Sequence, residues 1–382
     1  MTAADLRASL QHDLIDRWFP ACVSPDGGFH QEFDVQFRPL PTEGRMIIFQ
    51  ARMTWVCATL GMDDDAQHGV RYLRDHLWNA NRRAFRWTPE REDEYHAYAG
   101  AFAIYGLAAA GALDLAAEAF HGLEALYDPE FGGYFECMDS SGQVLLNPVG
   151  GKVSDGIGTP LGQKSQNSLL HLMEAFTELY TVWPDPLLRA RLAELLDWFR
   201  GRLMNPAGGQ FGFSTREGVG IPGSVSYGHD IEAAHLMLAA GDVLGVDCLA
   251  EAVTLGENVL AFGWDEVHGG TFFSGPPGHV ADRRFKNWWV QAEALLGFAI
   301  LATRTGDQRF ARVAARQWDW IRQHQIDSKF GGWHENVSEA GVPVIARKGH
   351  SWKAAYHDGR ALLFTARLLD DPKHAELFQA GA

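Results

Sequence analysis

The stretch Phe131-Gly132-Gly133-Tyr134-Phe135 is one of six short aromatic turns along the chain, and their recurrence decides the fold. Each turn is followed by a long segment whose apolar residues have helical spacing. Only the second turn lacks a pair of glycines. The other five turns are Asp26-Gly27-Gly28-Phe29-His30, Asn81-Arg82-Arg83-Ala84-Phe85-Arg86-Trp87, Gly208-Gly209-Gln210-Phe211, His268-Gly269-Gly270-Thr271-Phe272 and Phe330-Gly331-Gly332-Trp333-His334.

The segments between the turns are expected to be helices. Tight links such as Gly61-Met62-Asp63 and Gly306-Asp307 leave no room for another path, so the helices that they join are antiparallel neighbours. A short last helix is expected at residues 372–380. The twelve longer helices are expected near residues 4–18, 45–60, 64–79, 94–110, 113–127, 164–182, 186–202, 229–243, 245–262, 286–305, 307–324 and 353–370.

The alternation of tight and long links over six helix pairs predicts an all-α protein, an (α/α)6 barrel of inner and outer helices. The long links, with Gly-aromatic loops or short β-hairpins, are expected at one mouth of the barrel. An open solenoid is the competing arrangement, but it needs polar capping repeats, and neither terminal helix pair is more polar than the middle ones. Because the repeat runs from end to end, we expect a single domain over residues 1–382.

The composition disfavours several classes of function. The net charge is −15 and the basic residues are scattered, which gives no electrostatic footprint for nucleic acid or an anionic membrane. No run of about 18 apolar residues occurs, and residues 1–19 have the charge pattern of an amphipathic helix, so we expect neither a signal peptide nor a membrane span. The four cysteines, Cys22, Cys57, Cys137 and Cys248, are far apart, as is typical of reduced thiols in a cytoplasmic protein. We therefore expect a cytoplasmic monomer or homodimer whose partner is a small molecule.

The helices that follow a long link are predicted to form the inner ring. They are rich in Ala, Gly and Leu, and their N-terminal ends share one mouth, where six helix dipoles favour an anionic intermediate. Each start carries polar or aromatic residues, and pairs three or four apart project from one helix face. In chain order these residues are Arg52; Tyr95, His96 and Tyr98; Asn167 and His171; His229 and Glu232; Trp288, Trp289 and Glu293; and Trp352, His357 and Arg360.

Histidine is the group best suited to chemistry at this mouth. His171, His229 and His357 occupy corresponding places in the repeat, which indicates proton transfer near neutral pH. His96 is also consistent with an ordinary structural histidine. The tryptophans suit either core packing or stacking on sugar faces. The sequence contains no metal-binding or phosphate-binding motif, so neither a metal ion nor a cofactor is expected.

Four stretches at the inner helix starts carry a further signal. They are Ser226-Tyr227-Gly228-His229-Asp230-Ile231-Glu232, Phe285-Lys286-Asn287-Trp288-Trp289-Val290-Gln291-Ala292-Glu293-Ala294, Gln166-Asn167 with His171-Leu172-Met173-Glu174-Ala175, and Tyr356-His357-Asp358-Gly359-Arg360. Together with Gln50-Ala51-Arg52, they resemble the N-acylglucosamine 2-epimerase superfamily, which includes cellobiose 2-epimerases, mannose 2-epimerases and mannose isomerases. The combination is specific, although each motif alone is weak. The resemblance covers nearly the whole chain and implies an (α/α)6 barrel.

The resemblance also implies cofactor-free chemistry on a reducing sugar. The ring opens, a base removes the proton at C2 to give a cis-enediolate, and a proton returns to C2 in an epimerase or to C1 in an isomerase. His229, held by Glu232, and His357 would transfer the protons, and His171 would help to open the ring. Arg52 would stabilise the enediolate. The residues expected to bind the sugar are Asn167, Trp288, Trp289, Glu293, Trp352, Tyr98 and His96.

Details of the sequence favour an epimerase acting on a monosaccharide. Phe102-Ala103-Ile104-Tyr105-Gly106-Leu107 and the Gly-His-Asp-Ile-Glu helix start look closer to the epimerase branch than to mannose isomerases. Leu169 stands where we expect a second histidine in disaccharide epimerases, which favours mannose or glucose over cellobiose. His235 stands where the family often has tryptophan.

Two other classes of protein remain as alternatives. An (α/α)6 glycoside hydrolase needs two carboxylates about 5 to 10 Å apart, and Asp155, Asp230 and Glu232 are candidates, but the histidines would then lack a purpose. A non-catalytic carbohydrate-binding protein is the other alternative. Glu232 and Glu293 both lie in apolar stretches, where an unpaired carboxylate is costly to bury, so each is expected to have a function or a buried partner.

Overall fold

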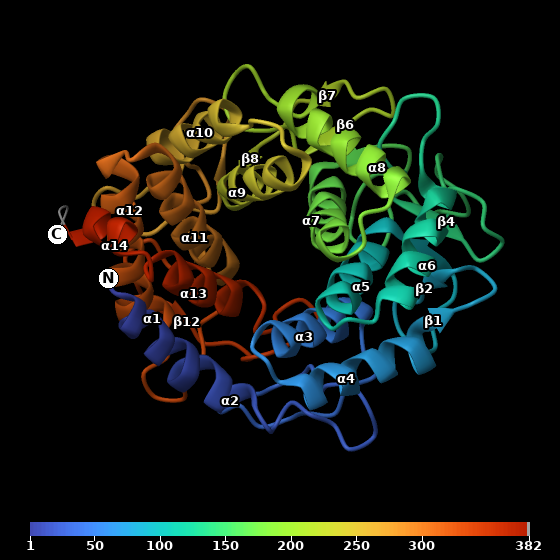
Figure 1. Cartoon of the computed structure of the whole chain (residues 1–382), viewed down its shortest axis with the longest axis horizontal. Helices are drawn as coiled ribbons and strands as arrows, with labels where there is room; N and C mark the ends of the chain where they lie inside the picture. The colour runs from blue at the N-terminus through green and yellow to red at the C-terminus, as the bar shows by residue number, and fades with distance from the viewer. Residues whose placement is uncertain (380–382) are drawn as a thin grey trace.

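The helices form two concentric rings in the computed structural model, which describes residues 1–379 (Figure 1). Within these residues six inner helices are surrounded by outer ones, as the predicted (α/α)6 barrel requires. The inner helices are α3 (Ile47–Thr59), α5 (Ala97–Ala109), α7 (Gln166–Val182), α9 (Tyr227–Leu244), α11 (Trp288–Thr305) and α13 (His357–Leu368). The outer helices are α1 (Ala3–Ser9) with α2 (Asp16–Trp18), α4 (Asp63–Tyr72), α6 (Leu113–Leu123), α8 (Pro186–Asp197), α10 (Leu249–Asn258) and α12 (Gln308–Trp320).

The ring is closed because the two ends of the chain meet. Outer helix α1 packs against the last inner helix, α13, and α14 (Pro372–Gln379) packs against α11 and α12. Between α3 and α13, the ring of Trp55 meets Tyr356 and Phe364 edge-on, with centroids 5.4 and 6.0 Å apart. These contacts exclude the open solenoid.

Inner helix α5 illustrates why the inner ring needs small residues. Every residue of α5 except the last is buried, so the helix is covered on all sides. A methyl group added at Gly106 would lie 2.6 Å from the carbonyl oxygen of Ala51 in α3, so glycine allows the two backbones to approach closely. Outer helix α12 is amphipathic instead, with Phe310 and Trp318 buried and Arg309 exposed.

The six aromatic turns share one geometry, as the repeat predicts. Each is closed by an antiparallel bridge, such as the one between Tyr127 and Tyr134. Both glycines of every Gly-Gly pair have positive φ, a conformation that strains other residues. In the second turn Arg83 takes a positive φ of 50° without a glycine. The other bridges pair Val23 with Phe29, Trp78 with Phe85, Met204 with Gln210, Trp264 with Thr271 and Ile326 with Trp333.

Short strands at the mouth join one repeat to the next. In four repeats, a strand that precedes an inner helix pairs with a strand in the following long loop. The helices predicted to start at residues 94, 164 and 286 therefore begin two or three residues later, because extended strand residues precede them. The strands are β1 (Trp78–Asn79), β2 (Ala84–Phe85), β3 (Glu94–His96), β4 (Cys137–Asp139), β5 (Lys164–Ser165), β6 (Phe213–Ser214), β7 (Gly220–Ile221), β8 (Val225–Ser226), β9 (Ser274–Gly275), β10 (Lys286–Asn287), β11 (Asn336–Val337) and β12 (Pro343–Val344).

Each outer helix includes a turn of altered pitch; η1 lies between α1 and α2, and the other five turns follow their helices shortly before an aromatic turn. Five of the turns within the described chain are π-helical and one is 3₁₀. They are η1 (Leu10–Ile15), η2 (Leu73–Leu77), η3 (Glu124–Leu126, the 3₁₀ turn), η4 (Trp198–Arg202), η5 (Val259–Gly263) and η6 (Ile321–Gln325).

The four cysteines are all buried and free. None of the helices between residues 1 and 379 has both the length and the apolar character needed to cross a membrane.

Candidate active site

Ten of the twelve predicted site residues line one cavity of about 210 Å³ at the mouth of the barrel. All six inner helices contribute, and each supplies its residues from within its first six positions. Trp352 comes from the loop before α13. The lining residues are Arg52, Tyr98, Asn167, His171, His229, Glu232, Trp288, Trp289, Trp352 and His357.

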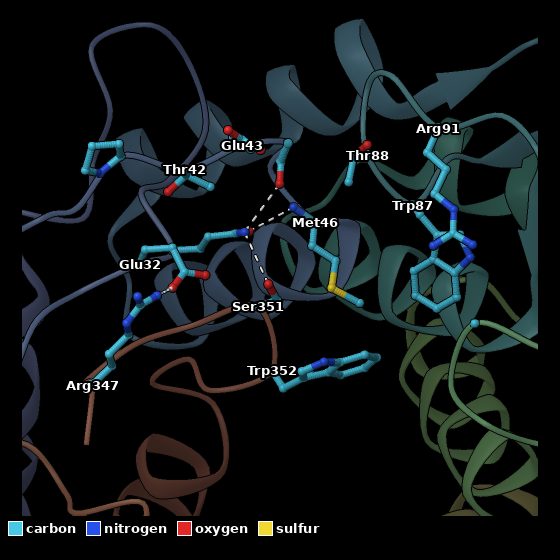
Figure 2. A pocket seen from close by; sticks show the side chains of 14 residues that line it. Glu32, Thr42, Glu43, Met46, Trp87, Thr88, Arg91, Arg347, Ser351 and Trp352 are labelled. Carbon is cyan, nitrogen blue, oxygen red and sulfur yellow. Dashed lines mark hydrogen bonds and ion pairs between the residues drawn. The ribbon is translucent and has the colours of Figure 1, made fainter. Parts of the chain in front are cut away.

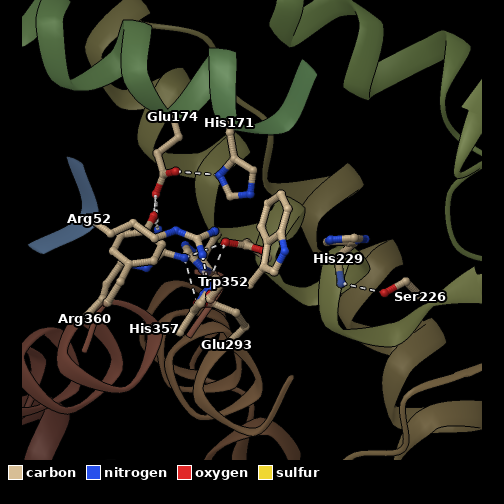
Figure 3. A network of polar contacts seen from close by, with 12 residues as sticks. Arg52, His171, Glu174, Ser226, His229, Glu293, Trp352, His357 and Arg360 are labelled. Atoms are coloured by element: carbon tan, nitrogen blue, oxygen red, sulfur yellow. Dashed lines mark hydrogen bonds and ion pairs between the residues drawn. The ribbon is translucent and has the colours of Figure 1, made fainter. Parts of the chain in front are cut away.

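Arg360 lies beneath this cavity and holds three buried carboxylates (Figure 3). Its Nη2 lies 2.6 Å from Glu232 Oε1 and 2.8 Å from Glu293 Oε1, and its Nη1 donates to Glu174 Oε1. Glu174 also accepts the hydroxyl of Tyr356. One guanidinium therefore ties together α7, α9, α11 and α13.

The three carboxylates do not share one protonation state. Burial acts to raise the pKa of Glu174, but Arg360 and His171 lower it to about 2. Burial likewise opposes ionisation of Glu293, yet Arg360 and two histidine hydrogen bonds hold its pKa well below the usual range. Burial and the nearby Glu293 raise the pKa of Glu232 well above its usual range, against the pull of Arg360. Arg360 and the histidines therefore favour the ionised forms of Glu174 and Glu293, whereas burial and the charge of Glu293 shift Glu232 towards its protonated form.

Two of the cavity histidines are oriented by these ionised carboxylates. His171 Nδ1 lies 2.8 Å from Glu174 Oε2, and His357 Nδ1 lies 2.6 Å from Glu293 Oε1. Because an ionised carboxylate only accepts hydrogen bonds, each Nδ1 carries the proton. The Nε2 lone pair of each neutral ring is left available. Burial lowers the pKa of His357 to about 3, although Glu293 opposes the shift, and burial also lowers the pKa of His171.

His229 is held by an aromatic ring rather than by a carboxylate. Its ring centroid lies 4.8 Å from that of Trp289, and its dashed contact in Figure 3 runs from its backbone N–H to Ser226. The expectation that Glu232 holds His229 is wrong, because Arg360 binds Glu232 instead. Burial lowers the pKa of His229 to about 3, and His171 and His357 act in the same direction.

Arg52 provides positive charge on the cavity wall. Its Nη1 donates to the carbonyl of Trp352 at 2.9 Å and its Nη2 to the hydroxyl of Tyr98 at 3.2 Å. Its guanidinium lies over Phe102, 4.3 Å from the ring centroid. No carboxylate among residues 1–379 lies within 4.0 Å of it, so its charge is free to interact with an anionic ligand. Asn167 Oδ1 is buried in the same cavity and has no hydrogen-bond partner among the residues that the structure describes.

Two predicted residues lie outside the cavity lining. Glu293 is fully buried and reaches the cavity through His357. His96 caps α5: its Nδ1 accepts the N–H of Tyr98 and its Nε2 lies 3.0 Å from Asp155 Oδ2. Its ring is therefore turned back onto the start of the helix, and His96 is a structural residue rather than a sugar ligand.

The carboxylates needed by a glycoside hydrolase are not assembled here. Of the three candidates only Glu232 lines the cavity. Asp155 binds His96, and Asp230 accepts the backbone N–H of Gln210 at 3.0 Å and the amide of Asn258 at 3.1 Å. Both aspartates hold loops in place.

Two clusters of buried acidic and histidine side chains have the spacing of metal ligands, but their side chains already have partners within the protein. Glu232, Glu293 and His357 are close enough to hold a metal ion, but Arg360 binds both carboxylates and already supplies a cation there. His96, Glu136 and Asp155 form a second cluster. The Nδ1 of His96 is used as an acceptor, so its Nε2 carries a proton rather than a free lone pair when the ring is neutral.

A larger pocket of about 430 Å³ adjoins the cavity and shares Trp352 as a wall (Figure 2). Trp87 and Arg91 lie on one side of it and Arg347 on another. Gln31 braces its floor by donating to Ser351 Oγ at 3.3 Å. Leu169, in contrast, is fully buried and lines neither space, so its identity does not set the width of the cavity.

Glu174, Tyr356 and Arg360 belong to the site but have no role in the sequence prediction, although Arg360 is among the polar residues at the inner helix starts. Helical spacing contained the signal, because Glu174 is three residues after His171 and Arg360 is three after His357, which places each pair on one helix face. Spacing along the chain does not show which carboxylate pairs with which cation across the ring of helices.

Comparisons with known proteins identify the family. The model of the N-acylglucosamine 2-epimerase (GlcNAc 2-epimerase) family matches residues 27–361. A cellobiose 2-epimerase of Ruminococcus albus is 28% identical over 94% of this chain and 97% of its own length. A D-mannose isomerase of Marinomonas mediterranea is 25% identical over 89% of this chain and 91% of its own. The solved cellobiose 2-epimerase of Bacillus thermoamylovorans matches with a TM-score of 0.86 at 26% identity, over 96% of this chain and 99% of that one. The chain belongs to the N-acylglucosamine 2-epimerase family.

Proposed function

We propose that this protein is a cofactor-independent sugar 2-epimerase, which interconverts the C2 epimers of a reducing sugar. The observation that carries the proposal is that His229 and His357 line one cavity with the cation Arg52. Burial lowers the pKa of both histidines to about 3, which favours the unprotonated form that a base needs. The family supports it, because the relatives named above are epimerases and an aldose–ketose isomerase.

The first step opens the sugar ring to the free aldehyde. His171 is suited to this step because Glu174 holds the proton on Nδ1 and leaves the Nε2 lone pair available to take the proton of the C1 hydroxyl. The bond between C1 and the ring oxygen breaks as the C1 carbonyl forms, and the ring oxygen takes up a proton from the His171 ring or from water, so the step is balanced. Asn167 Oδ1 lacks a partner and is available to accept a sugar hydroxyl.

The second step moves a proton at C2. One of the two histidines removes it, and a proton then returns to the opposite face of the planar cis-enediolate, so C2 is inverted with no net change in atoms or electrons. His229 and His357 project from α9 and α13, on either side of α11, and their rings lie 4.8 and 5.8 Å from the ring of Trp289. The negative charge of the enediolate favours the protonated form of a neighbouring histidine. That protonated histidine can then act as the acid that returns a proton to C2.

The enediolate is stabilised by groups that are in place before the reaction. Arg52 offers a cation that is not neutralised by a carboxylate within 4.0 Å in the described part of the chain. Glu232 lines the cavity, and its Oε2 is buried with no hydrogen-bond partner among residues 1–379, so the protonated form of Glu232, which its raised pKa favours, would offer a donor there. Six inner helix N-termini add their positive ends at this mouth.

We propose a monosaccharide of the mannose or glucose type as the substrate, bound in the cavity between the tryptophans. The pocket beyond Trp352 leaves room for a second sugar unit, so a disaccharide is the variant to test beside it (Figure 2). A sugar is the only partner proposed, and the protein is expected to act in the cytoplasm as a monomer or homodimer.

A panel of sugars tests the proposal. D-mannose, D-glucose and cellobiose are incubated with the protein and the products separated, with methyl mannoside as a control whose ring cannot open. Formation of the C2 epimer from a reducing sugar, and no reaction of methyl mannoside, is the expected result. Fructose from mannose would make the protein an isomerase, and release of free mannose from the methyl glycoside would overturn the proposal.

A further inference from the structure

His235 lies deeper in the barrel than the cavity and has not been used so far. It is buried and does not line the cavity. His229, Glu232 and His235 follow one another at intervals of three residues on α9, so each side chain neighbours the next in a row that winds around the helix as it runs inward from the mouth. Its Nε2 lies 2.8 Å from Glu293 Oε2.

Glu293 joins His235 to the catalytic histidine. Its Oε1 accepts from His357 Nδ1 at 2.6 Å and lies 2.8 Å from Arg360, so His235 is the one partner of Oε2 in the described part of the chain. Because Glu293 is ionised and only accepts, His235 must carry its proton on Nε2. Both oxygens of a fully buried carboxylate are thus satisfied.

We propose that His235 is a positioning residue for the epimerase reaction, which holds Glu293 so that the carboxylate keeps the His357 ring in the orientation and tautomer of a base. Without His235, Oε2 would have no partner among residues 1–379. The Glu293 carboxylate could then rotate away from His357, or, if it stays in place, its negative charge would act more strongly on the His357 ring. The inference rests on the proposed function, since it assigns a support to the base of that reaction.

The charged groups around Glu293 determine in which direction the loss of His235 shifts the pKa of His357. Glu232 and His235 face it from α9, His357 and Arg360 from α13, and Glu174 lies on the other side of Arg360 from α7. Removing the His235 donor leaves more of the negative charge of Glu293 to stabilise the protonated His357 ring, because Arg360 still keeps Glu293 ionised. The acid limb of activity is therefore expected to move to higher pH.

Two substitutions of similar size separate positioning from packing. His235→Gln keeps an N–H donor near Nε2, whereas His235→Leu fills the space without one. His235→Leu is expected to lower kcat by about 100-fold, the scale of a misplacement of about 1 Å in a catalytic group, with little change in KM. His235→Gln is expected to recover most of that loss. Met237→Leu, at a buried neighbour on the same helix, is the packing control and leaves kcat unchanged.

Measurements in the sugar-free protein keep the test independent of the proposed function. Nitrogen-15 NMR of the His357 ring is expected to show a proton on Nδ1 in the wild type and a raised pKa in His235→Leu. Equal losses in the Gln and Leu variants, with an unchanged acid limb and unchanged His357 resonances, would overturn the inference. A wild type that turns over no reducing sugar would instead overturn the proposed function, while the NMR difference would still report on His235.

Discussion

Replacing Arg360 by methionine is expected to destabilise the barrel more than any single surface change. Arg360 is buried and is the cation shared by Glu174, Glu232 and Glu293, which are themselves buried. Methionine keeps most of the side-chain volume but removes the charge. The two ionised carboxylates are then left in the interior without the guanidinium.

The magnitude follows from the cost of an unpaired buried charge. Breaking a buried ion pair by removing one partner costs about 3 to 5 kcal/mol. For a chain of 382 residues the entropy of unfolding is about 0.8 kcal/mol per degree near the melting temperature. The melting temperature is therefore expected to fall by about 4 to 6 °C at neutral pH.

The pH dependence distinguishes this cause from a loss of packing. The pKa of Glu174 is lowered to about 2 in the folded protein, so its contribution to stability is present above its ordinary pKa of 4.5 and is lost as the pH falls towards 2. Without Arg360, burial raises the pKa of the same carboxyl, and folding at neutral pH then opposes ionisation. The difference in melting temperature between wild type and variant is expected to be largest near pH 8 and to shrink near pH 4.

The assay is thermal unfolding followed by circular dichroism or calorimetry at both pH values. Arg309→Met is the matched control, because Arg309 also binds two carboxylates, Asp307 and Glu257, but is 52% exposed. An exposed pair contributes about 0 to 1 kcal/mol, so this control is expected to melt within about 1 °C of the wild type. An Arg360→Met protein with the same deficit at pH 4 and pH 8 would refute the reasoning.

Three further predictions concern the reaction itself. His229→Ala and His357→Ala are each expected to lower kcat/KM for epimerisation by about 10²- to 10⁴-fold while the protein stays folded, and retention of more than a tenth of the activity in either variant would count against its role. Because the pKa of each of these histidines is lowered to about 3, the neutral base persists far below the ordinary pKa of 6.5, so kcat/KM is expected to stay level from about pH 8 to about pH 5. A fall centred near pH 6.5 would contradict that assignment. Treatment with EDTA is expected to leave activity intact, and a loss that a divalent ion restores would contradict the expectation of metal-free chemistry.

The layout of the fold was predictable because it depends on local signals that repeat. Link lengths separated inner from outer helices, and the inner helix starts then brought distant residues such as Arg52 and His357 to one cavity. The helices expected to begin at residues 94, 164 and 286 begin later in the structure because short strands precede them. A strand of two or three residues is too short to show the alternating pattern of apolar residues that would reveal it in the sequence.

The pairing of charges was less predictable than their location. Glu232 and its partner Arg360 are 128 residues apart, whereas the supposed partner His229 is its neighbour on the helix, and spacing alone favoured the neighbour. The geometry of the ring decides otherwise, because one guanidinium can serve three carboxylates from different helices. His96 was misassigned for a similar reason: its place at a helix start suits a cap as well as a ligand, and Asp155 completes the cap.

Inversion of C2 through an enediolate leaves an isotopic record, because the proton that returns to C2 comes from a group that exchanges with the solvent. The decisive measurement is therefore incubation of the protein with D-mannose in deuterated water, followed by NMR of the products. D-glucose that carries deuterium at C2 is expected, with the label absent when His357 is replaced by alanine. Glucose formed without deuterium at C2, or no exchange in any reducing sugar, would rule out proton transfer at C2 by these histidines.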